Sequence, residues 1–119
     1  MQYLLLSLLL IFQLSVSAQW SEVQMPRPNV QLSAVSLSNK IYLAGGNMDS
    51  STPMEVIDIY DVERKSWEEK SLGEAKLFIA AVNSENKLIF GGGLTGFFPT
   101  LTFSNLIEVY DPILDEWDS

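Results

Sequence analysis

The acid–base chemistry open to this chain rests mainly on its carboxylates. The 119 residues include 15 Asp and Glu but neither histidine nor cysteine. The chain therefore holds no Ser-His-Asp or Cys-His machinery and none of the usual zinc ligand sets. Glycosidases act with two carboxylates, and Asp49 and Glu55 are a candidate pair whose separation the sequence does not give. Because acids are common in surface loops, we expect no catalytic residue and no metal site.

A glycine-rich string gives the second candidate for chemistry. Residues Gly91-Gly92-Gly93-Leu94-Thr95-Gly96 match the G-x-G-x-x-G pattern and follow an apolar run. Dinucleotide binding needs a helix to begin there, so that its amino-terminal N–H groups face the pyrophosphate. The next residues, 97–103, are aromatic, β-branched and interrupted by a proline, which does not favour a helix. We therefore predict no cofactor.

The elements that carry these residues occur twice. Each copy has a glycine pair, then a tyrosine, then a tryptophan: Gly45-Gly46, Tyr60 and Trp67 in the first, and Gly92-Gly93, Tyr110 and Trp117 in the second. The glycines recur after 47 residues and the aromatic residues after 50, so the loop after the glycines is three residues longer in the second copy. Trp20 also lies 47 residues before Trp67. Fixed periods of this length are typical of repeat architectures.

Within each copy the apolar pattern predicts four antiparallel strands. Short apolar runs are separated by polar, turn-forming residues, and the third strand alternates acidic and apolar residues. The fourth strand is short and charged, which discourages pairing with another sheet edge. The predicted strands are 32–37, 41–44, 56–62 and 66–72 in the first copy, and 77–82, 87–90, 106–111 and 116–118 in the second. The fold class is therefore all-β.

This ordered set of glycines and aromatic residues resembles the kelch repeat, in which each unit forms one four-stranded blade of a β-propeller. The resemblance implies a blade over residues 30–72, a second over 77–119, and an outer strand of a preceding blade over 19–25. Kelch repeats often carry a basic residue at the position of Arg27. The equivalent at an offset of 47 is Glu74, which departs from the pattern.

The repeated residues are expected to have structural roles. Glycines at the end of the second strand allow dihedral angles closed to other residues and a close approach of the neighbouring sheet. Tyr60 and Trp67 are expected on adjacent strands of one blade, where wide rings fill the gap between fanned sheets.

Residues 1–18 have the layout of a secretory signal peptide, with an apolar core over 4–14 and small residues before Gln19. The core is shorter than the roughly 20 residues that span a bilayer. We expect export and cleavage after Ala18, with a retained membrane anchor as the alternative. The net charge of −8 argues against nucleic-acid binding.

Two blades are fewer than the four to eight of typical propellers. The sequence leaves two interpretations open: a fragment of a longer exported propeller, or a short chain that assembles into a ring from several copies.

The expected function is an extracytoplasmic binding module, without enzymatic activity, that recognises a protein or a glycan through loops between strands. The loop 94–105 carries apolar residues where polar ones are usual, namely Phe97, Phe98, Leu101 and Phe103. These residues are either a binding surface or a cover for the adjacent blade. The alternative function is a non-catalytic or carboxylate-bearing part of a secreted carbohydrate-active propeller enzyme.

Overall fold

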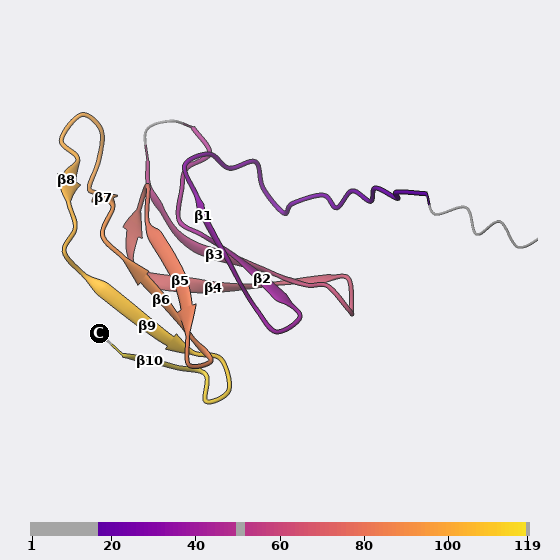
Figure 1. Cartoon of the computed structure of the whole chain (residues 1–119). Coiled ribbons are helices and arrows are strands. Elements are labelled where there is room, and N and C mark those ends of the chain that lie inside the picture. The colour runs from indigo at the N-terminus through magenta and orange to yellow at the C-terminus, as the bar shows by residue number, and fades with distance from the viewer. Residues whose placement is uncertain (1–16, 50–51, 119) are drawn as a thin grey trace, which may run out of the picture.

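The computed structural model describes residues 17–49 and 52–118, in which every regular element is a β-strand (Figure 1). The all-β prediction is therefore confirmed. Of the predicted signal peptide, 1–18, only Ser17 and Ala18 lie within the described residues. Across the two described ranges, no helix is long and apolar enough to cross a membrane.

The first four strands form one antiparallel sheet, which we call blade 1. They are β1 (Ser33–Leu37), β2 (Lys40–Ala44), β3 (Met54–Asp61) and β4 (Ser66–Lys76), hydrogen-bonded in that order. The register pairs Tyr42 with both Val35 and Ile59, so these side chains share one face of the sheet. Blade 1 thus has the four strands and the order that its sequence predicts.

The second sheet, blade 2, repeats this arrangement. Its strands are β5 (Ala80–Ser84), β6 (Lys87–Gly91), β9 (Ile107–Asp111) and β10 (Glu116–Asp118), in the spatial order β10-β9-β6-β5. The two sheets lie side by side with β1 close to β5, as Figure 1 shows. The two repeats therefore fold as two adjacent four-stranded blades.

The turns before the outer strands have the same geometry in both blades. The Oδ1 atom of Asp61 accepts hydrogen bonds from the amides two and three residues later, at 3.0 and 2.9 Å. Asp111 does the same at 2.9 and 3.2 Å. Each turn ends in a residue with a φ of 55°, Lys65 or Asp115. An aspartate at the start of the turn therefore sets its shape, although the second turn contains two apolar residues.

One predicted strand begins later than the sequence indicates. The apolar run 77–82 suggests an inner strand from Leu77, but β5 begins at Ala80. Phe78 has a φ of 54°, which interrupts extended backbone, and Leu77 pairs with Leu94 instead. The strand extends in the other direction, to Ser84, and the turn contracts to Glu85 and Asn86. Apolar composition alone does not locate this boundary, because Leu77 and Ile79 are buried in the connection between the blades.

The loop after Gly93 contains a small hairpin that the sequence does not predict. Its strands are β7 (Leu94–Thr95) and β8 (Thr102–Phe103), paired antiparallel over two residues each. In Figure 1 this hairpin projects beyond the ends of the blade strands. This loop is three residues longer than the corresponding loop of blade 1, and the hairpin forms its base.

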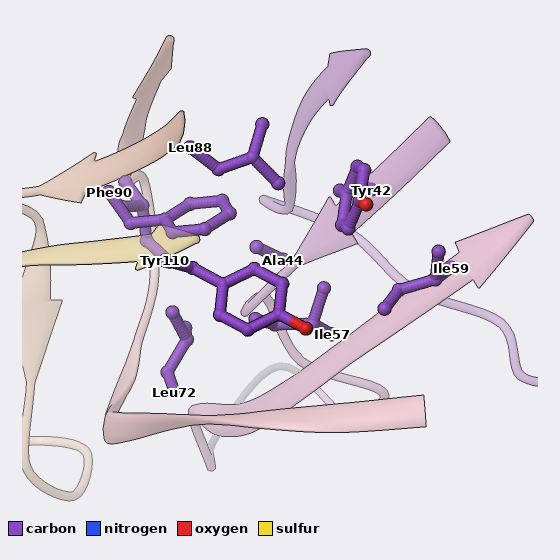
Figure 2. Packing of buried hydrophobic residues seen from close by; sticks show 9 residues of the cluster. Tyr42, Ala44, Ile57, Ile59, Leu72, Leu88, Phe90 and Tyr110 are labelled. Atoms are coloured by element: carbon purple, nitrogen blue, oxygen red, sulfur yellow. The ribbon is translucent and has the colours of Figure 1, made fainter. Parts of the chain in front are cut away.

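The core of the molecule lies between the two blades (Figure 2). Blade 1 contributes side chains from β2, β3 and β4, and blade 2 contributes side chains from β6 and β9. The largest exposed fraction among these residues is 3%: Tyr42, Ala44, Ile57, Ile59, Leu72, Leu88, Phe90 and Tyr110. Burial of these groups from water is the main stabilising contribution, so each sheet depends on its neighbour.

Residues 19–25 form no strand, and Trp20 is 96% exposed. The residues described here include no sheet that this segment could join. Its assignment as the outer strand of another blade stays a prediction.

Candidate functional site

The repeated glycines lie where β2 and β6 end, and all four adopt the left-handed region. Their φ angles are 69° and 87° for Gly45 and Gly46, and 69° and 92° for Gly92 and Gly93. A Cβ on Gly45 would come within 2.5 Å of the carbonyl oxygen of Lys76, the last residue of β4. At Gly45 the dihedral angle favours glycine, as expected, and the close approach comes from the end of β4 and from Ile79 in the connection to blade 2.

An ion pair to an acid of the third strand recurs in both blades. The guanidinium of Arg27 binds both carboxylate oxygens of Asp58, each at 3.0 Å, and also contacts Glu69. In blade 2 the ammonium of Lys76 lies 3.0 Å from Glu108 Oε2. Hydrogen bonds to Glu69, then to Asp58, raise the pKa of Arg27 above its usual value. Each blade therefore fixes an acid of its third strand with a cation from the segment that precedes it.

This recurrence corrects the expected departure at Glu74. The basic residue of blade 2 is Lys76, two positions later, and its side chain is completely buried. The residue aligned with Arg27 by the offset of 47, Glu74, instead accepts a hydrogen bond from Ser104 at 2.8 Å, which lowers its pKa. The sequence did contain a signal, because Lys76 and Glu108 are separated by 32 residues and Arg27 and Asp58 by 31.

The tyrosine and tryptophan of each repeat are cross-strand partners. Tyr60 pairs with Trp67 and Tyr110 with Trp117, with ring centroids 4.9 and 4.8 Å apart. The prediction of adjacent strands is confirmed for Tyr60 and Trp67. Tyr110 is buried, whereas Tyr60 and Trp67 are half-buried and Trp117 is 39% exposed. Aromatic contacts of this kind hold the outer strand to its blade.

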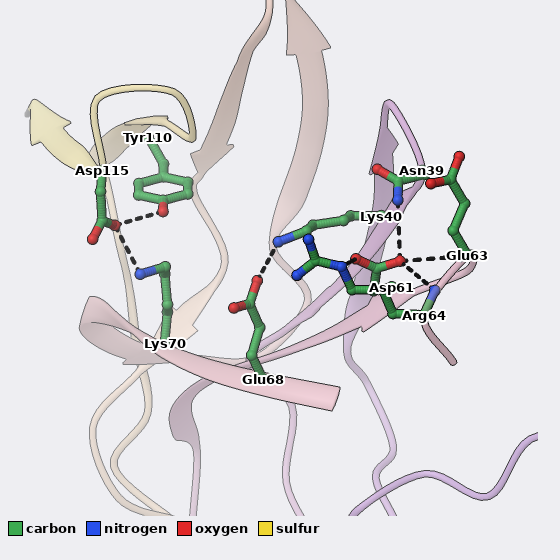
Figure 3. Close-up of polar contacts among 9 residues, drawn as sticks. All are labelled: Asn39, Lys40, Asp61, Glu63, Arg64, Glu68, Lys70, Tyr110 and Asp115. Carbon is green, nitrogen blue, oxygen red and sulfur yellow. Dashed lines mark hydrogen bonds and ion pairs between the residues drawn. The ribbon is translucent and has the colours of Figure 1, made fainter. Parts of the chain in front are cut away.

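A polar contact joins β4 of blade 1 to β9 and the following turn of blade 2 (Figure 3). The hydroxyl of Tyr110 donates to Asp115 Oδ1 at 2.6 Å, and the ammonium of Lys70 in blade 1 lies 2.7 Å from the same oxygen. Burial, with the hydrogen bond to Asp115, raises the pKa of Tyr110 to about 12. The hydrogen bonds from Lys70 and Tyr110 lower the pKa of Asp115. This contact ties the edges of the blades together.

The candidate binding loop, 94–105, presents most of its apolar side chains to solvent. Phe97, Phe98 and Phe103 are 72%, 67% and 91% exposed, and Leu101 is half-buried. These three exposed rings do not cover blade 1. Their exposure favours the interpretation of the loop as a surface over its interpretation as a cover.

The base of this loop is held by backbone hydrogen bonds, some of them to the connection between the blades. Leu94 and Leu77 exchange backbone hydrogen bonds of 2.8 and 2.9 Å, and the Ser104 amide donates to Gly93 at 2.9 Å. The exposed rings therefore extend from a fixed base, as binding loops on rigid scaffolds do.

The two acids of the candidate pair lie on either side of the start of β3. Asp49 accepts a hydrogen bond from the Thr52 amide at 3.1 Å, and Glu55 is exposed on β3. No group of three acidic residues that could hold a metal ion is found among residues 17–49 and 52–118. The glycine string enters β7 instead of a helix, so the helix terminus needed for a pyrophosphate is not at this place.

The fold defines this chain as two adjacent blades of an incomplete β-propeller. The family model of the Kelch motif matches residues 28–71, which cover blade 1. Kelch-like protein 23 of Pongo abelii is 30% identical over 102 residues, and its Mus musculus counterpart is 29% identical over the same length. Kelch-like protein 25 of Xenopus tropicalis is 26% identical over 102 residues. The Kelch motif over residues 28–71 and the similarity to Kelch-like proteins support a kelch-repeat family for this chain.

These alignments cover 84%, 84% and 81% of this chain. They cover 17% of each relative, so the chain spans about a sixth of their length.

Proposed function

We propose that this chain is a binding module that captures another protein through the loop 94–105 and performs no chemistry itself. The observation that carries the proposal is the exposure of Phe97, Phe98 and Phe103 on one loop. Exposed apolar patches rimmed by polar residues mark interaction sites, and aromatic residues are enriched at the centres of interfaces. Kelch repeats and Kelch-like relatives support the assignment as an interaction module.

The form of the loop favours a protein partner over a glycan. Two neighbouring phenylalanines offer apolar area but no hydrogen-bonding side-chain atoms, which sugar hydroxyl groups require. Anchors of this type fit apolar pockets on a protein surface. A glycan partner would depend instead on the polar loop 47–55, where Asn47 is buried against Gln31.

We also propose that the module acts outside the cytoplasm, with residues 1–18 removed. The support is the apolar segment with a small-residue exit before Gln19. Amino-terminal sequencing of the exported protein should give Gln19 as the first residue. A chain that keeps Met1 after export would contradict cleavage.

The binding surface is tested with the double variant Phe97→Ser/Phe98→Ser. Its partners are compared with those of the unchanged chain by crosslinking in an extract of exported proteins. The matched control is Ile113→Ser/Leu114→Ser, which replaces two neighbouring apolar residues that are 81% and 63% exposed in a turn. We expect the loop variant to lose its captured protein and to keep its melting temperature, and the control to keep both.

Two results would contradict the proposal. If the loop variant captures its partner as well as the unchanged chain does, the binding surface lies elsewhere. A large loss of folding in the loop variant alone would show that the two rings stabilise the loop instead of binding a partner. A glycan array probed with the same proteins separates a sugar ligand from a protein ligand.

A further inference from the structure

The contact between the two blades uses one face of each, and these faces differ. Blade 1 contributes Ile57 and Ile59, each 1% exposed, while blade 2 contributes Leu88 and Phe90, both fully buried. The amide of Asn83 in β5 adds a hydrogen bond of 2.6 Å to the carbonyl of Ser36 in β1. The interface is therefore heterologous: two unlike surfaces fit together.

Blade 2 carries a second copy of the surface that blade 1 uses, and this copy is uncovered. Ile107, the repeat equivalent of Ile57, is 57% exposed, and Val82, the equivalent of Val35, is 54% exposed. A Cβ on Gly45 would strike Lys76 and Ile79 in the segment that leads into blade 2, but a Cβ on the equivalent Gly92 would have nothing within 4 Å. We call this surface face A; it comprises Val82, Ile89, Ile107 and Val109.

Blade 1 carries a second copy of the surface that blade 2 uses. Ile41, the equivalent of the fully buried Leu88, is 37% exposed. Leu43 and Tyr60, the equivalents of Phe90 and Tyr110, are half-buried, whereas those two are at most 3% exposed. Arg27 lies over Asp58 beside this surface, as Lys76 lies over Glu108 within the internal contact. We call this surface face B; it comprises Ile41, Leu43, Tyr60 and Trp67.

We propose that copies of this chain associate head to tail, with face A of one copy on face B of the next. The argument is that both halves of an interface already present inside the chain recur uncovered on its two sides. A second copy brings the matching half without any new surface. Repeats that stack in this way gain stability from each neighbour contact. The proposal is independent of the loop 94–105.

The charge of the chain predicts how this association responds to salt. Each copy has a net charge of −8, so two copies repel each other while the apolar faces attract. Salt screens the repulsion and leaves the apolar contact, so association should become stronger as ionic strength rises. A partner bound mainly through ion pairs would show the opposite response.

The first experiment measures the mass of the purified chain by size-exclusion chromatography with light scattering over a range of concentrations. We expect a mass that rises with concentration and with salt. A monomeric mass throughout would overturn the proposal. That result would leave face A to a further blade of a longer chain or to a foreign partner.

The second experiment identifies the faces with one substitution on each. Ile107→Asp disrupts face A, and Ile41→Asp disrupts face B. Each variant should raise the dissociation constant of association at least about tenfold, because a carboxylate would be buried unpaired in the contact. Mixed together, the two variants should form a dimer and nothing larger, since each retains one good face. Association of either variant with itself would show a like-with-like contact and would overturn the head-to-tail arrangement.

The control is Ile113→Asp, which places the same charge on an isoleucine that is 81% exposed. Ile113 borders the hollow between the blades within the chain, together with Leu37 and Tyr42, and belongs to neither open face. It should associate as the unchanged chain does. Circular dichroism and melting of all three variants separate loss of association from loss of folding.

Discussion

Lys76 and Glu108 form a buried ion pair that joins the segment before blade 2 to the third strand of that blade. Lys76 Nζ lies 3.0 Å from Glu108 Oε2, and the two side chains are 0% and 5% exposed. Glu108 also accepts a hydrogen bond from the Gly73 amide, and Lys76 Nζ lies 3.6 Å from Glu74. The carboxylate of Glu108 is therefore held by two donors from β4, so the pair holds blade 2 against blade 1.

Removing one member of this pair should destabilise the chain strongly. Lys76→Met leaves Glu108 charged and buried, and a loss of about 3 to 5 kcal/mol in the free energy of unfolding is expected. The double variant Lys76→Met/Glu108→Leu should recover much of this loss, because two apolar side chains need no partner. Urea denaturation measures both, with the exposed Lys65→Met as control. A single variant as stable as the unchanged chain would contradict the role of the pair.

Alanine at Gly45 and at Gly92 should separate two contributions to the loss of stability. One is the strain of a left-handed φ angle, and the other is the clash of a Cβ with nearby atoms. Both glycines have a φ of 69°, so alanine at either position should cost about 1 to 2 kcal/mol in left-handed strain. Of these two, only Gly45→Ala also meets atoms at the end of β4 and in the connection to blade 2, the Lys76 carbonyl oxygen at 2.5 Å and Ile79 Cδ1 at 2.6 Å. Gly45→Ala should therefore lower the melting temperature clearly more than Gly92→Ala. Equal effects would mean that the close approach does not matter.

The two tryptophans should differ in their contribution to stability. Trp67 is half-buried and Trp117 is 39% exposed, so alanine at either position should cost less than the about 3 to 5 kcal/mol of a fully buried ring. Trp67→Ala should cost more than Trp117→Ala, because less of the Trp67 ring is in water. Thermal unfolding followed by circular dichroism checks the order, and an unchanged melting temperature for Trp67→Ala would remove its structural role.

Tyr110 should make the fold sensitive to alkali. Its pKa is raised to about 12, whereas a tyrosine in the unfolded chain ionises near about 10. Between these values the folded chain binds the proton more tightly, so the stabilisation is complete below about pH 10 and is lost as the pH rises toward 12. Denaturation at several pH values should show this decline.

Tyr110→Phe is the variant that isolates this titration. It removes the phenol but keeps the ring against Trp117, and it also loses the hydrogen bond to Asp115. We expect lower stability at neutral pH and a shallower decline between pH 10 and 12. Burial raises the pKa of Tyr42 as well, so a residual decline is expected. A decline as steep as in the unchanged chain would assign the effect to other groups.

The sequence determined the architecture of this protein because repetition is a property of residue order. Two copies of a glycine pair, a tyrosine and a tryptophan were enough to predict two four-stranded blades and to place Tyr60 and Trp67 on adjacent strands. Turn chemistry is equally local: Asp61 and Asp111 shape their turns through amides two and three residues away. Short-range constraints of this kind can be inferred without coordinates.

Only the tertiary structure decided which repeat-equivalent residues are covered. Ile57 and Ile107 occupy the same place in their blades, yet one is buried and the other is 57% exposed, because within residues 17–49 and 52–118 a sheet packs on that face of blade 1 alone. Lys76 was missed for a similar reason: its partner Glu108 lies 32 residues away, and the alignment by offset pointed to Glu74. Burial and long-range pairing depend on the neighbour in space, and residue order alone does not specify that neighbour.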